Sequence, residues 1–428
     1  MLWRSTARNM SPSRPASQTS VAVGLLSAGA TSYDLGGLGL TMGNDTLRLK
    51  DVGPIREADV TFGDLTVLVG PQATGKSVLL QFLRLLLDTG PIFRTLRKHG
   101  LKWDRKVDSF LDLYLGEGMG GLWHPGQSSI SWRDTTVDLN RLVHFGKSAQ
   151  KERSFFIPAQ RVLALSRDGW FRPFTDYKAG DPFTVRDFSE KLRVLMESSL
   201  GRAQAVFPQP KRLKGEIRKL LSRNIFRDFH LEVDKTGPQK RLLLTEPEQA
   251  TQLPFMVWSA GQREFVPLLL GLYWLLPPTK VKRRGSIQWV IIEELEAGLH
   301  PKAIEAMLFI VLDLLWREYR VCLSTHSAHV LDLVWALRNL REHHADPKEV
   351  LRVFDVKSTP STVKLGDAAL TKEMKVHYFD QSGTTHDISN LDPAAEGTME
   401  AHWGGLTEFS GRVADIVAEA VAASGGRE

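Results

Sequence analysis

A glycine-rich turn followed by a lysine and a serine is the part of the chain best suited to chemistry. The apolar residues before it predict a buried strand, and the apolar residues after it predict a helix. In this setting the backbone N–H groups of the turn and the positive end of the helix attract phosphate oxygens. We therefore predict that the turn binds a nucleotide, with Lys76 at the β- and γ-phosphates and Ser77 at Mg²⁺. The spacing is G-x-x-x-x-G-K-S, the P-loop pattern, and its residues are Gly70, Pro71, Gln72, Ala73, Thr74, Gly75, Lys76 and Ser77.

Two adjacent carboxylates follow a second apolar segment, residues 287–292, which predicts another buried strand. At the end of a strand beside the P-loop, Glu293 is suited to hold Mg²⁺ and Glu294 to polarise the attacking water as a general base. An ordinary acidic strand end would have the same sequence. The P-loop upstream favours the catalytic interpretation, in which the segment is a Walker B motif with Glu293 in the place usually held by aspartate.

A further candidate lies where a predicted helix begins, at residues 264–276. Ser259, Gly261 and Gln262 precede this helix, and small residues at a helix N-terminus form an anion-binding cradle. The structural alternative is that Ser259 acts only as the helix N-cap. We predict that these three residues bind nucleotide.

Two loops that follow predicted strands add polar candidates. His326 comes after the strand 320–324, where an imidazole is placed to contact the γ-phosphate, although a single histidine is more often structural. Gln160 comes after the strand-like residues 154–157 and is a candidate to contact Mg²⁺ or water, with Arg161 as the alternative. We therefore predict catalytic roles for Glu294, His326 and Gln160.

The order of the elements predicts an α/β fold. Strands alternate with helices after residue 255, which is typical of a mostly parallel sheet flanked by helices. We expect the nucleotide-binding core to comprise residues 43–89 and 251–345. We expect residues 90–250 to form a mainly helical insert that includes the loop at Gln160.

The two ends of the chain carry weaker patterns. Residues 1–42 are rich in serine and proline and begin with a basic stretch, so we expect a disordered tail or a start codon assigned too early, with Met42 as the alternative start. Residues 346–428 are expected to contribute strands at 351–356 and 376–380 and a last helix that packs on the core.

The composition limits the size of the core, the cellular compartment and the partners that can be expected. A chain of 428 residues that is 42% hydrophobic has enough apolar residues for a large core, arranged as two or three domains or as one elaborated domain. The single cysteine, Cys322, excludes a disulfide framework and favours a reducing compartment, so we expect a cytoplasmic protein. No apolar run reaches the roughly 18 residues that a membrane span requires. The net charge of +6 is compatible with a nucleic-acid partner.

In this order, the motifs resemble those of ABC-type ATPases. More narrowly, the chain is similar to the soluble subgroup related to SMC and RecF proteins and to ATPases of the overcoming-lysogenisation-defect type. The shared phrases are Gly-Pro-Ile at 53–55, Ser-Ala-Gly-Gln-Arg-Glu at 259–264, Ile-Glu-Glu-Leu-Glu-Ala-Gly-Leu-His-Pro at 292–301 and Ser-Thr-His-Ser at 324–327. The resemblance covers about residues 45–340, with residues 90–250 matching only loosely. Gln72, Leu295 and Gly298 replace the usual Asn, Pro and His, which leaves the phosphate and metal ligands intact but the subfamily open.

The resemblance implies a head-to-tail dimer with two ATP molecules, each bound with Mg²⁺, between facing subunits. Residues 259–262 would be the signature segment, which caps the nucleotide of the partner, and residues 295–301 would be the D-loop, which contacts the partner. Relatives of this kind act on DNA or serve in antiphage defence as sensors that control an effector, often a nuclease. We therefore expect an ATPase that regulates or acts on nucleic acid, in antiphage defence or DNA repair.

Alternatives remain for both partner and function. Two basic segments, 94–106 and 211–223, are candidates for contact with double-stranded DNA, although each is equally explained as a solvated surface. The chain would alternatively be the ATP-binding subunit of a membrane transporter, a class in which the P-loop and the signature segment are closer in sequence. A P-loop kinase or a nucleotide-gated scaffold would leave the paired glutamates and the signature segment without a role.

Overall fold

The computed structural model describes residues 45–145, 150–198, 200–202, 205–209, 212–227, 229–237, 239–246, 248, 251–276, 282–392 and 398–425. The expected tail at 1–42 lies outside these residues. The chain from residue 43 onward forms one compact unit. Among the described residues, no helix combines the length and the apolar character needed to cross a membrane.

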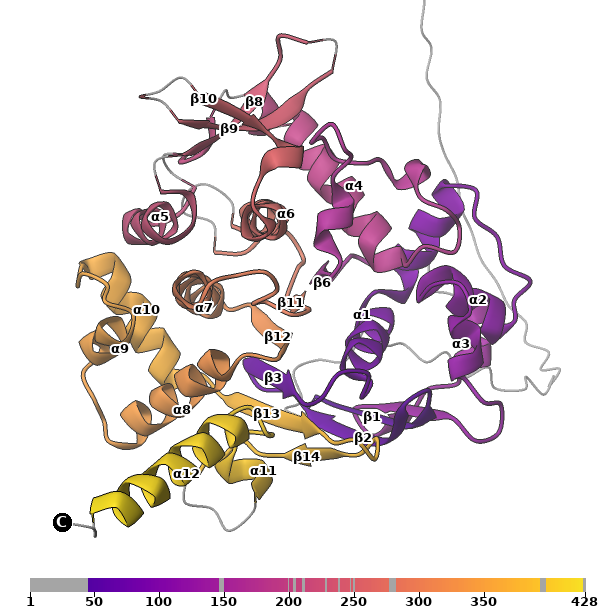
Figure 1. The fold of residues 1–428 in the computed structure, drawn as a ribbon. Helices are drawn as coiled ribbons and strands as arrows, with labels where there is room; N and C mark the ends of the chain where they lie inside the picture. Colours follow the sequence, from indigo (N-terminus) through magenta and orange to yellow (C-terminus); the bar gives the residue numbers. More distant parts are fainter. Residues whose placement is uncertain are drawn as a thin grey trace, which may run out of the picture. The chain divides into compact units, whose positions relative to one another are not determined.

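A six-stranded sheet in the order β14-β13-β3-β12-β11-β6 forms the centre of this unit (Figure 1). The four pairings from β6 to β13 are parallel, and β14 alone pairs antiparallel, with β13. The mostly parallel sheet predicted from the alternation of strands and helices is thereby confirmed. Its strands are β3 (Leu65–Val69), β6 (Ser154–Ile157), β11 (Trp289–Ile292), β12 (Arg320–Thr325), β13 (Met374–Phe379) and β14 (Thr385–Asp387).

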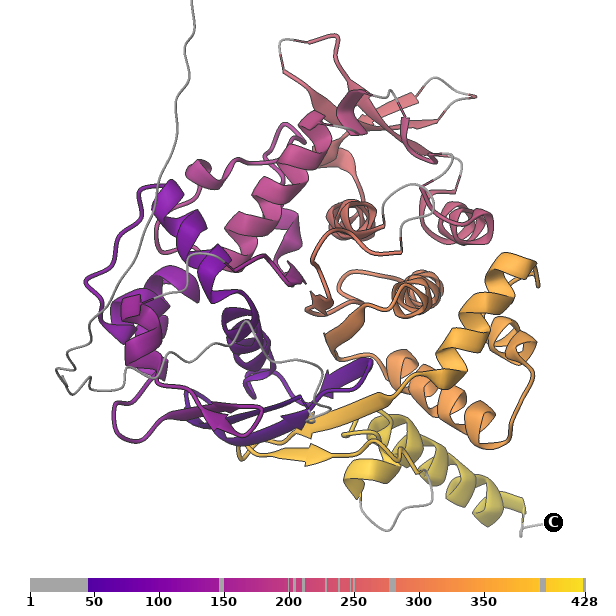
Figure 2. The same cartoon turned by 180° about the vertical axis from the view of Figure 1, so that it is seen from behind.

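Successive side chains of the central strands point to opposite faces and enter two separate cores. Val67 and Val69 belong to one core, while Leu68 between them belongs to the other. The helix after the P-loop, α1 (Lys76–Lys98), packs in the core of Leu68. The opposite core holds α6 (Ala260–Leu275), α7 (Pro301–Trp316), α8 (Ala328–Glu342) and α10 (Pro360–Thr371), and Figure 2 shows these helices across the sheet from α1.

A second, antiparallel sheet covers α1 on the side of the Leu68 core. Its order is β2-β1-β4-β5, and Leu47 and Leu49 of β1 enter the same core as α1. The turn at Gly53 and Pro54 joins β1 to β2. The strands are β1 (Thr46–Val52), β2 (Ile55–Thr61), β4 (Ser129–Trp132) and β5 (Thr135–Thr136).

Residues 90–250, expected to be mainly helical, mix helices and strands. Besides β4, β5 and β6, this segment supplies three strands of a four-stranded sheet in the order β10-β9-β8-β7. The helices are α2 (Val107–Tyr114), α3 (Leu139–Phe145), α4 (Phe183–Ser198) and α5 (Gly215–Leu221). The strands of the separate sheet are β7 (Ala205–Phe207), β8 (His230–Asp234), β9 (Arg241–Glu246) and β10 (Thr251–Pro254).

The strand expected at residues 351–356 is wrong. This stretch begins as the end of a helix, α9 (Pro347–Val353), which the Asp346 side chain caps by accepting a hydrogen bond of 2.8 Å from the backbone N–H of Lys348. Val350 and Leu351 are buried together in the core of α7 and α10. The short alternation of apolar and polar residues fits a strand and a helical turn equally well, and the Asp-Pro helix start decides between them.

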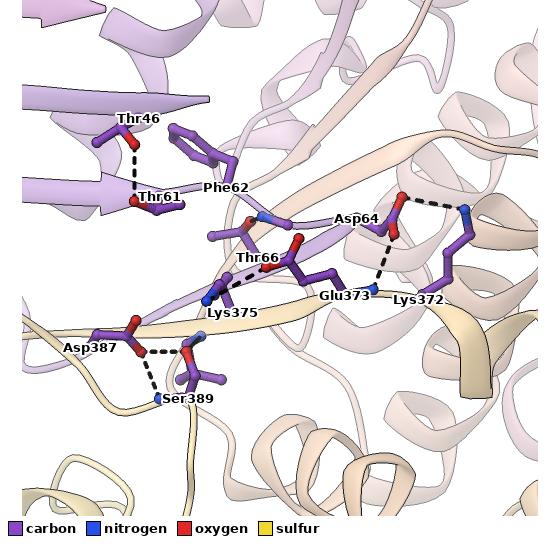
Figure 3. A network of polar contacts seen from close by, with 12 residues as sticks. Thr46, Thr61, Phe62, Asp64, Thr66, Lys372, Glu373, Lys375, Asp387 and Ser389 are labelled. Carbon is purple, nitrogen blue, oxygen red and sulfur yellow. Dashed lines mark hydrogen bonds and ion pairs between the residues drawn. The ribbon is translucent and has the colours of Figure 1, made fainter. Parts of the chain in front are cut away.

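The expected strand at 376–380 is confirmed as β13, which lies beside β3. Figure 3 shows how the chain entering β13 is tied to the start of β3: the Asp64 carboxylate accepts hydrogen bonds from Lys372 Nζ at 3.3 Å and from the backbone N–H of Glu373 at 3.1 Å. Beyond β13, Ser389 donates its backbone N–H to Asp387 at 2.9 Å. The C-terminal segment is therefore a part of the central sheet and helps to define the edge that carries the P-loop.

The last two helices are α11 (Thr398–Ala401) and α12 (Glu408–Gly425). We expected the last helix to pack on the core. Its apolar side chains are instead largely exposed, with 68% of Phe409, 59% of Ile416 and 63% of Val421 accessible to solvent.

Candidate nucleotide-binding and hydrolysis site

The P-loop connects β3 to α1 and is shaped by two glycines with positive φ. Gly70 has φ 142° and Gly75 has φ 98°, a region that side chains other than hydrogen rarely allow. A Cβ atom at Gly70 would lie 2.2 Å from the carbonyl oxygen of Phe379 at the end of β13, and one at Gly75 would lie 2.3 Å from Ile55 Cγ1. The turn is therefore packed between β13 and the β1–β2 hairpin, and its curvature requires both glycines.

Lys76 is buried at the first position of α1. Its ammonium group donates hydrogen bonds to the carbonyl oxygens of Gly70 at 2.7 Å and Pro71 at 2.6 Å. Burial lowers the pKa of Lys76 to about 8, while the charges of Glu294 and Glu296 act in the opposite direction. The lysine of the P-loop and two carboxylates of the loop after β11 thus lie within electrostatic reach of one another.

Glu293 directly follows β11, and only 2% of its surface is exposed. Its Oε2 atom accepts a hydrogen bond of 3.1 Å from the backbone N–H of Ala159, whereas Oε1 has no hydrogen-bond partner among the described residues. Burial raises the pKa of Glu293 to about 7, although the Ala159 N–H and the Ser77 hydroxyl lower it in part. A buried carboxylate oxygen without a partner, next to a serine hydroxyl, fits the hard oxygen ligands of Mg²⁺. Ser77 and Glu293 would therefore hold this ion.

Glu294 is held through its backbone, so its partly exposed side chain is left for chemistry. Its φ of 45° lies in the left-handed region, which is uncommon for a glutamate. The backbone N–H donates to Ser324 Oγ at 3.2 Å, and the carbonyl oxygen accepts from both terminal nitrogens of Arg161 at 3.1 Å. The charge of Glu294 raises the pKa of Lys76, so the carboxylate lies within electrostatic reach of the P-loop lysine. The role as a base stays a prediction.

His326 follows β12 and is half-buried. Burial lowers the pKa of His326, and the positive charge of Lys76 lowers it further, so the imidazole is neutral near pH 7. Glu296 fixes this loop by accepting a hydrogen bond of 2.5 Å from the backbone N–H of His326 and one of 2.9 Å from Thr325 Oγ1. The sequence pattern placed Glu296 only within the D-loop at 295–301, expected to contact the partner, and did not predict its contact with the loop of His326.

The two candidates after β6 differ in their surroundings. Gln160 is exposed and follows Ala159, the residue whose N–H binds Glu293, so its loop lies beside the proposed Mg²⁺ ligand. Its catalytic role stays a prediction. Arg161 is fully buried and donates to main-chain carbonyl groups, as described below.

Ser259 does cap α6, as the structural alternative proposed. Its Oγ accepts from the backbone N–H of Gln262 at 3.2 Å, and Gln262 Oε1 accepts from the backbone N–H of Ser259 at 3.0 Å. This capping box leaves the N–H groups of Ala260 and Gly261 at the helix start, where an anion is attracted. Since α6 packs on the face of the sheet opposite α1, the signature segment and the P-loop belong to different layers. Nucleotide binding by these residues stays a prediction.

The sheet order, the P-loop and the paired glutamates define an α/β P-loop nucleoside triphosphatase fold. A family model described as "AAA domain, putative AbiEii toxin, Type IV TA system" matches residues 65–332, and the chain belongs to this family. Among curated proteins, none matches the chain.

Solved structures similar to this chain include SMC heads and an ABC transporter cassette. An SMC head bound to the C-winged helix domain of ScpA is 11% identical, with a TM-score of 0.38, over 80% of this chain and 96% of that chain. An SMC head domain from Thermotoga maritima is 12% identical, with a TM-score of 0.30, over 68% and 92%. A dimeric bacterial ABC transporter cassette is 10% identical, with a TM-score of 0.31, over 80% and 98%.

Proposed function

We propose that the chain binds ATP with Mg²⁺ and hydrolyses it. The observation that supports this most directly is the buried Glu293 carboxylate beside Ser77, with one oxygen that has no hydrogen-bond partner among the described residues. Burial of a carboxylate without a cation partner is costly, and proteins accept this cost mainly where the group serves a ligand. Lys76, Glu294 and His326 follow β3, β11 and β12, which are neighbouring parallel strands, so they lie at the same end of the sheet, and this supports a common site.

The proposed reaction is hydrolysis of the γ-phosphate. The N–H groups of the P-loop and Lys76 bind the β- and γ-phosphates, for which Lys76 exchanges its present carbonyl partners for phosphate oxygens. Bound Mg²⁺ would neutralise charge on these phosphates. Glu294 takes a proton from water, the water oxygen bonds to the γ-phosphorus, and the bond from that phosphorus to the bridging oxygen breaks, giving ADP and phosphate. Neutral His326 donates a hydrogen bond to the γ-phosphate.

A second copy of the chain would complete the site. The N–H groups at the start of α6 form an anion cradle on the face opposite α1, which suits a phosphate held by another subunit. Directly before this cradle, Met256 is 57% exposed and Val257 is 61% exposed, so apolar surface is available for contact. We propose an ATP-dependent homodimer that closes over two nucleotides and opens on hydrolysis.

The closing dimer would regulate or act on nucleic acid, and the family description, which names a toxin of a toxin–antitoxin system, supports a role in defence.

The structure favours one of the two basic segments as a contact for DNA. Lys214, Lys219 and Arg223 of the segment 211–223 form ion pairs with Asp313, Glu216 and Asp355. In the segment 94–106, Lys106 forms an ion pair with Asp104, and further exposed cations are grouped at the end of α1 and just after it; they include Arg97, Lys98, Lys102 and Arg105.

The test is ATP turnover by the purified chain, with and without double-stranded DNA, with Glu294→Gln as the blank. We expect turnover that Glu294→Gln removes and that DNA stimulates, and we expect DNA stimulation to fall when Lys98 and Lys102 are both changed to glutamate. Changing Lys219 and Arg223 to glutamate is the matched control. Turnover that survives Glu294→Gln would refute the proposed chemistry, whereas turnover indifferent to DNA would point to a protein partner.

A further inference from the structure

Arg161 donates hydrogen bonds to several main-chain carbonyl groups around the site, but to none of the side chains of the predicted reacting residues. It is 0% exposed and follows β6 at the start of a short 3₁₀ helix (Arg161–Ala164). Its Nη1 donates to the carbonyl oxygens of Glu293 and Glu294 at 3.1 Å, and Nη2 donates to those of Glu294 at 3.1 Å and Ala297 at 3.3 Å. Its Nε donates to the carbonyl oxygen of Glu264 at 3.3 Å.

The charge of this guanidinium is opposed by several nearby carboxylates. Burial lowers the pKa of Arg161. The negative charges of four glutamates act against this effect. Glu264 on α6, whose carboxylate lies 3.7 Å from Arg161 Nε, has the largest influence, followed by Glu296, Glu294 and Glu293. A planar group with five N–H donors holds several acceptors in a fixed geometry, which a lysine cannot do. Because the acceptors are main-chain carbonyls, the carboxylates of Glu293 and Glu294 stay available for a metal ion and for water.

The loop held by Arg161 also packs directly on the start of α6. A Cβ atom at Gly298, whose φ is 71°, would lie 3.0 Å from Glu264 Cγ. A Cβ atom at Gly261 would lie 3.0 Å from the carbonyl oxygen of Gly298. The start of α6 and the D-loop therefore pack against each other, next to the backbone of Glu294. Arg161 donates hydrogen bonds to α6, to the D-loop and to the carbonyl oxygen of Glu294.

We propose that Arg161 is a positioning residue that couples the signature segment to the general base of the same subunit. The proposal rests on the proposed function, in which the signature segment contacts the nucleotide of the second copy. A shift of α6 on that contact moves the Glu264 carbonyl, and Arg161 passes the shift to the carbonyl of Glu294, so hydrolysis in one site depends on occupancy of the other. Such a chain of bonded groups is a physical route for coupling between sites.

The test compares Arg161→Met and Arg161→Lys with a matched control, Arg186→Lys. Arg186 is equally buried, at 1% exposure, and donates to the carbonyl oxygen of Leu113 at 2.6 Å, away from the site. We expect Arg161→Met to bind a non-hydrolysable ATP analogue within about threefold of wild type, to lose kcat by at least about tenfold and to lose any sigmoidal dependence on ATP concentration. Arg161→Lys should recover part of kcat, and Arg186→Lys should match wild type.

Wild-type kcat and wild-type ATP dependence in Arg161→Met would overturn the proposal. The proposal would also be overturned if Arg186→Lys lost kcat as well, and if the loss of kcat in each variant were proportional to its loss of thermal stability. Hydrogen exchange of residues 294–299 separates this test from that of the proposed function, because it needs no turnover. If the hydrogen bonds of Arg161 hold this loop, these residues exchange faster in Arg161→Met even when wild type shows no ATPase activity. Unchanged exchange would show that Arg161 does not hold the loop.

Discussion

Replacement of Glu293 by glutamine should make the nucleotide-free protein more stable while it removes Mg²⁺-dependent ATP binding. The carboxylate of Glu293 is buried, and its Oε1 lacks a hydrogen-bond partner among the described residues. In the folded protein the pKa of Glu293 is raised from 4.5 to about 7 by burial, so the folded state disfavours the charged form. Glutamine keeps an oxygen that accepts from Ala159 and carries no charge.

The size of the effect follows from this difference in pKa. A rise from 4.5 to about 7 corresponds to about 3 kcal/mol of destabilisation once the group is charged in both states. Between these two values the folded state binds more protons than the unfolded state, so stability falls as the pH rises. The cost is absent below about pH 4.5, and it is present in full above about pH 7. Glu293→Gln should therefore be more stable than wild type by about 2–3 kcal/mol at alkaline pH and nearly equal to it in acid.

The assay is urea unfolding of wild type and Glu293→Gln across this pH range, with a metal chelator and without nucleotide. Asp88 is also buried, with a pKa raised to about 6, so the wild-type curve alone does not isolate Glu293. The difference between the two proteins does, because Asp88 is common to both. A constant difference across the pH range, or a Glu293→Gln variant that is less stable than wild type at alkaline pH, would refute the reasoning. Mg²⁺ and ATP should stabilise only the wild type.

The remaining predictions concern the other parts of the site. Lys76→Ala should weaken ATP binding by at least about a hundredfold, because the only side-chain ammonium predicted at the phosphates is lost; equilibrium titration with a fluorescent analogue measures this, and retained tight binding would remove the P-loop assignment. Glu294→Gln should bind ATP normally, lose turnover by about a hundredfold or more and accumulate as a dimer with ATP, which light scattering would detect. Ser259→Arg should leave ATP binding by the monomer intact but prevent that dimer from forming; an unaffected ATP-dependent dimer would contradict the capping role in trans.

The sequence was sufficient to place the elements that carry the chemistry. The strand before the P-loop, the strand before Glu293 and the strand before His326 were all predicted, and β3, β11 and β12 are adjacent in the sheet. Such motifs combine a buried apolar strand with turn residues at fixed spacing, which is local information. The strand predicted at 351–356 was wrong because that pattern is short, and local periodicity alone does not separate a strand from a helical turn over so few residues.

Contacts between distant loops were not predictable in this way. Glu296 binds the loop of His326, 30 residues further along the chain, and Arg161 binds carbonyls 132 to 136 residues away. Neither residue has a spacing that signals its role, since each acts on main-chain groups whose position depends on the whole sheet. Gln160 was favoured over Arg161 for a chemical role because the sequence does not show which groups surround each side chain in the folded protein.

These contacts also explain how the predicted catalytic residues are oriented although they lie just beyond the ends of the strands. The parallel strands fix where each loop begins, but they leave the direction of Glu294 and His326 to the loops themselves. Ser324 holds the N–H of Glu294, Glu296 holds the N–H of His326, and Arg161 holds the carbonyl of Glu294. Each holding group belongs to a different segment from the group it holds: Ser324 lies in β12, Glu296 in the loop after β11 and Arg161 in the 3₁₀ helix after β6, so these segments form one cross-linked edge. We therefore expect a shift of any one of these holding groups to reach Glu294, the predicted general base, without a change in the sheet, which is the property that a switch driven by nucleotide binding requires.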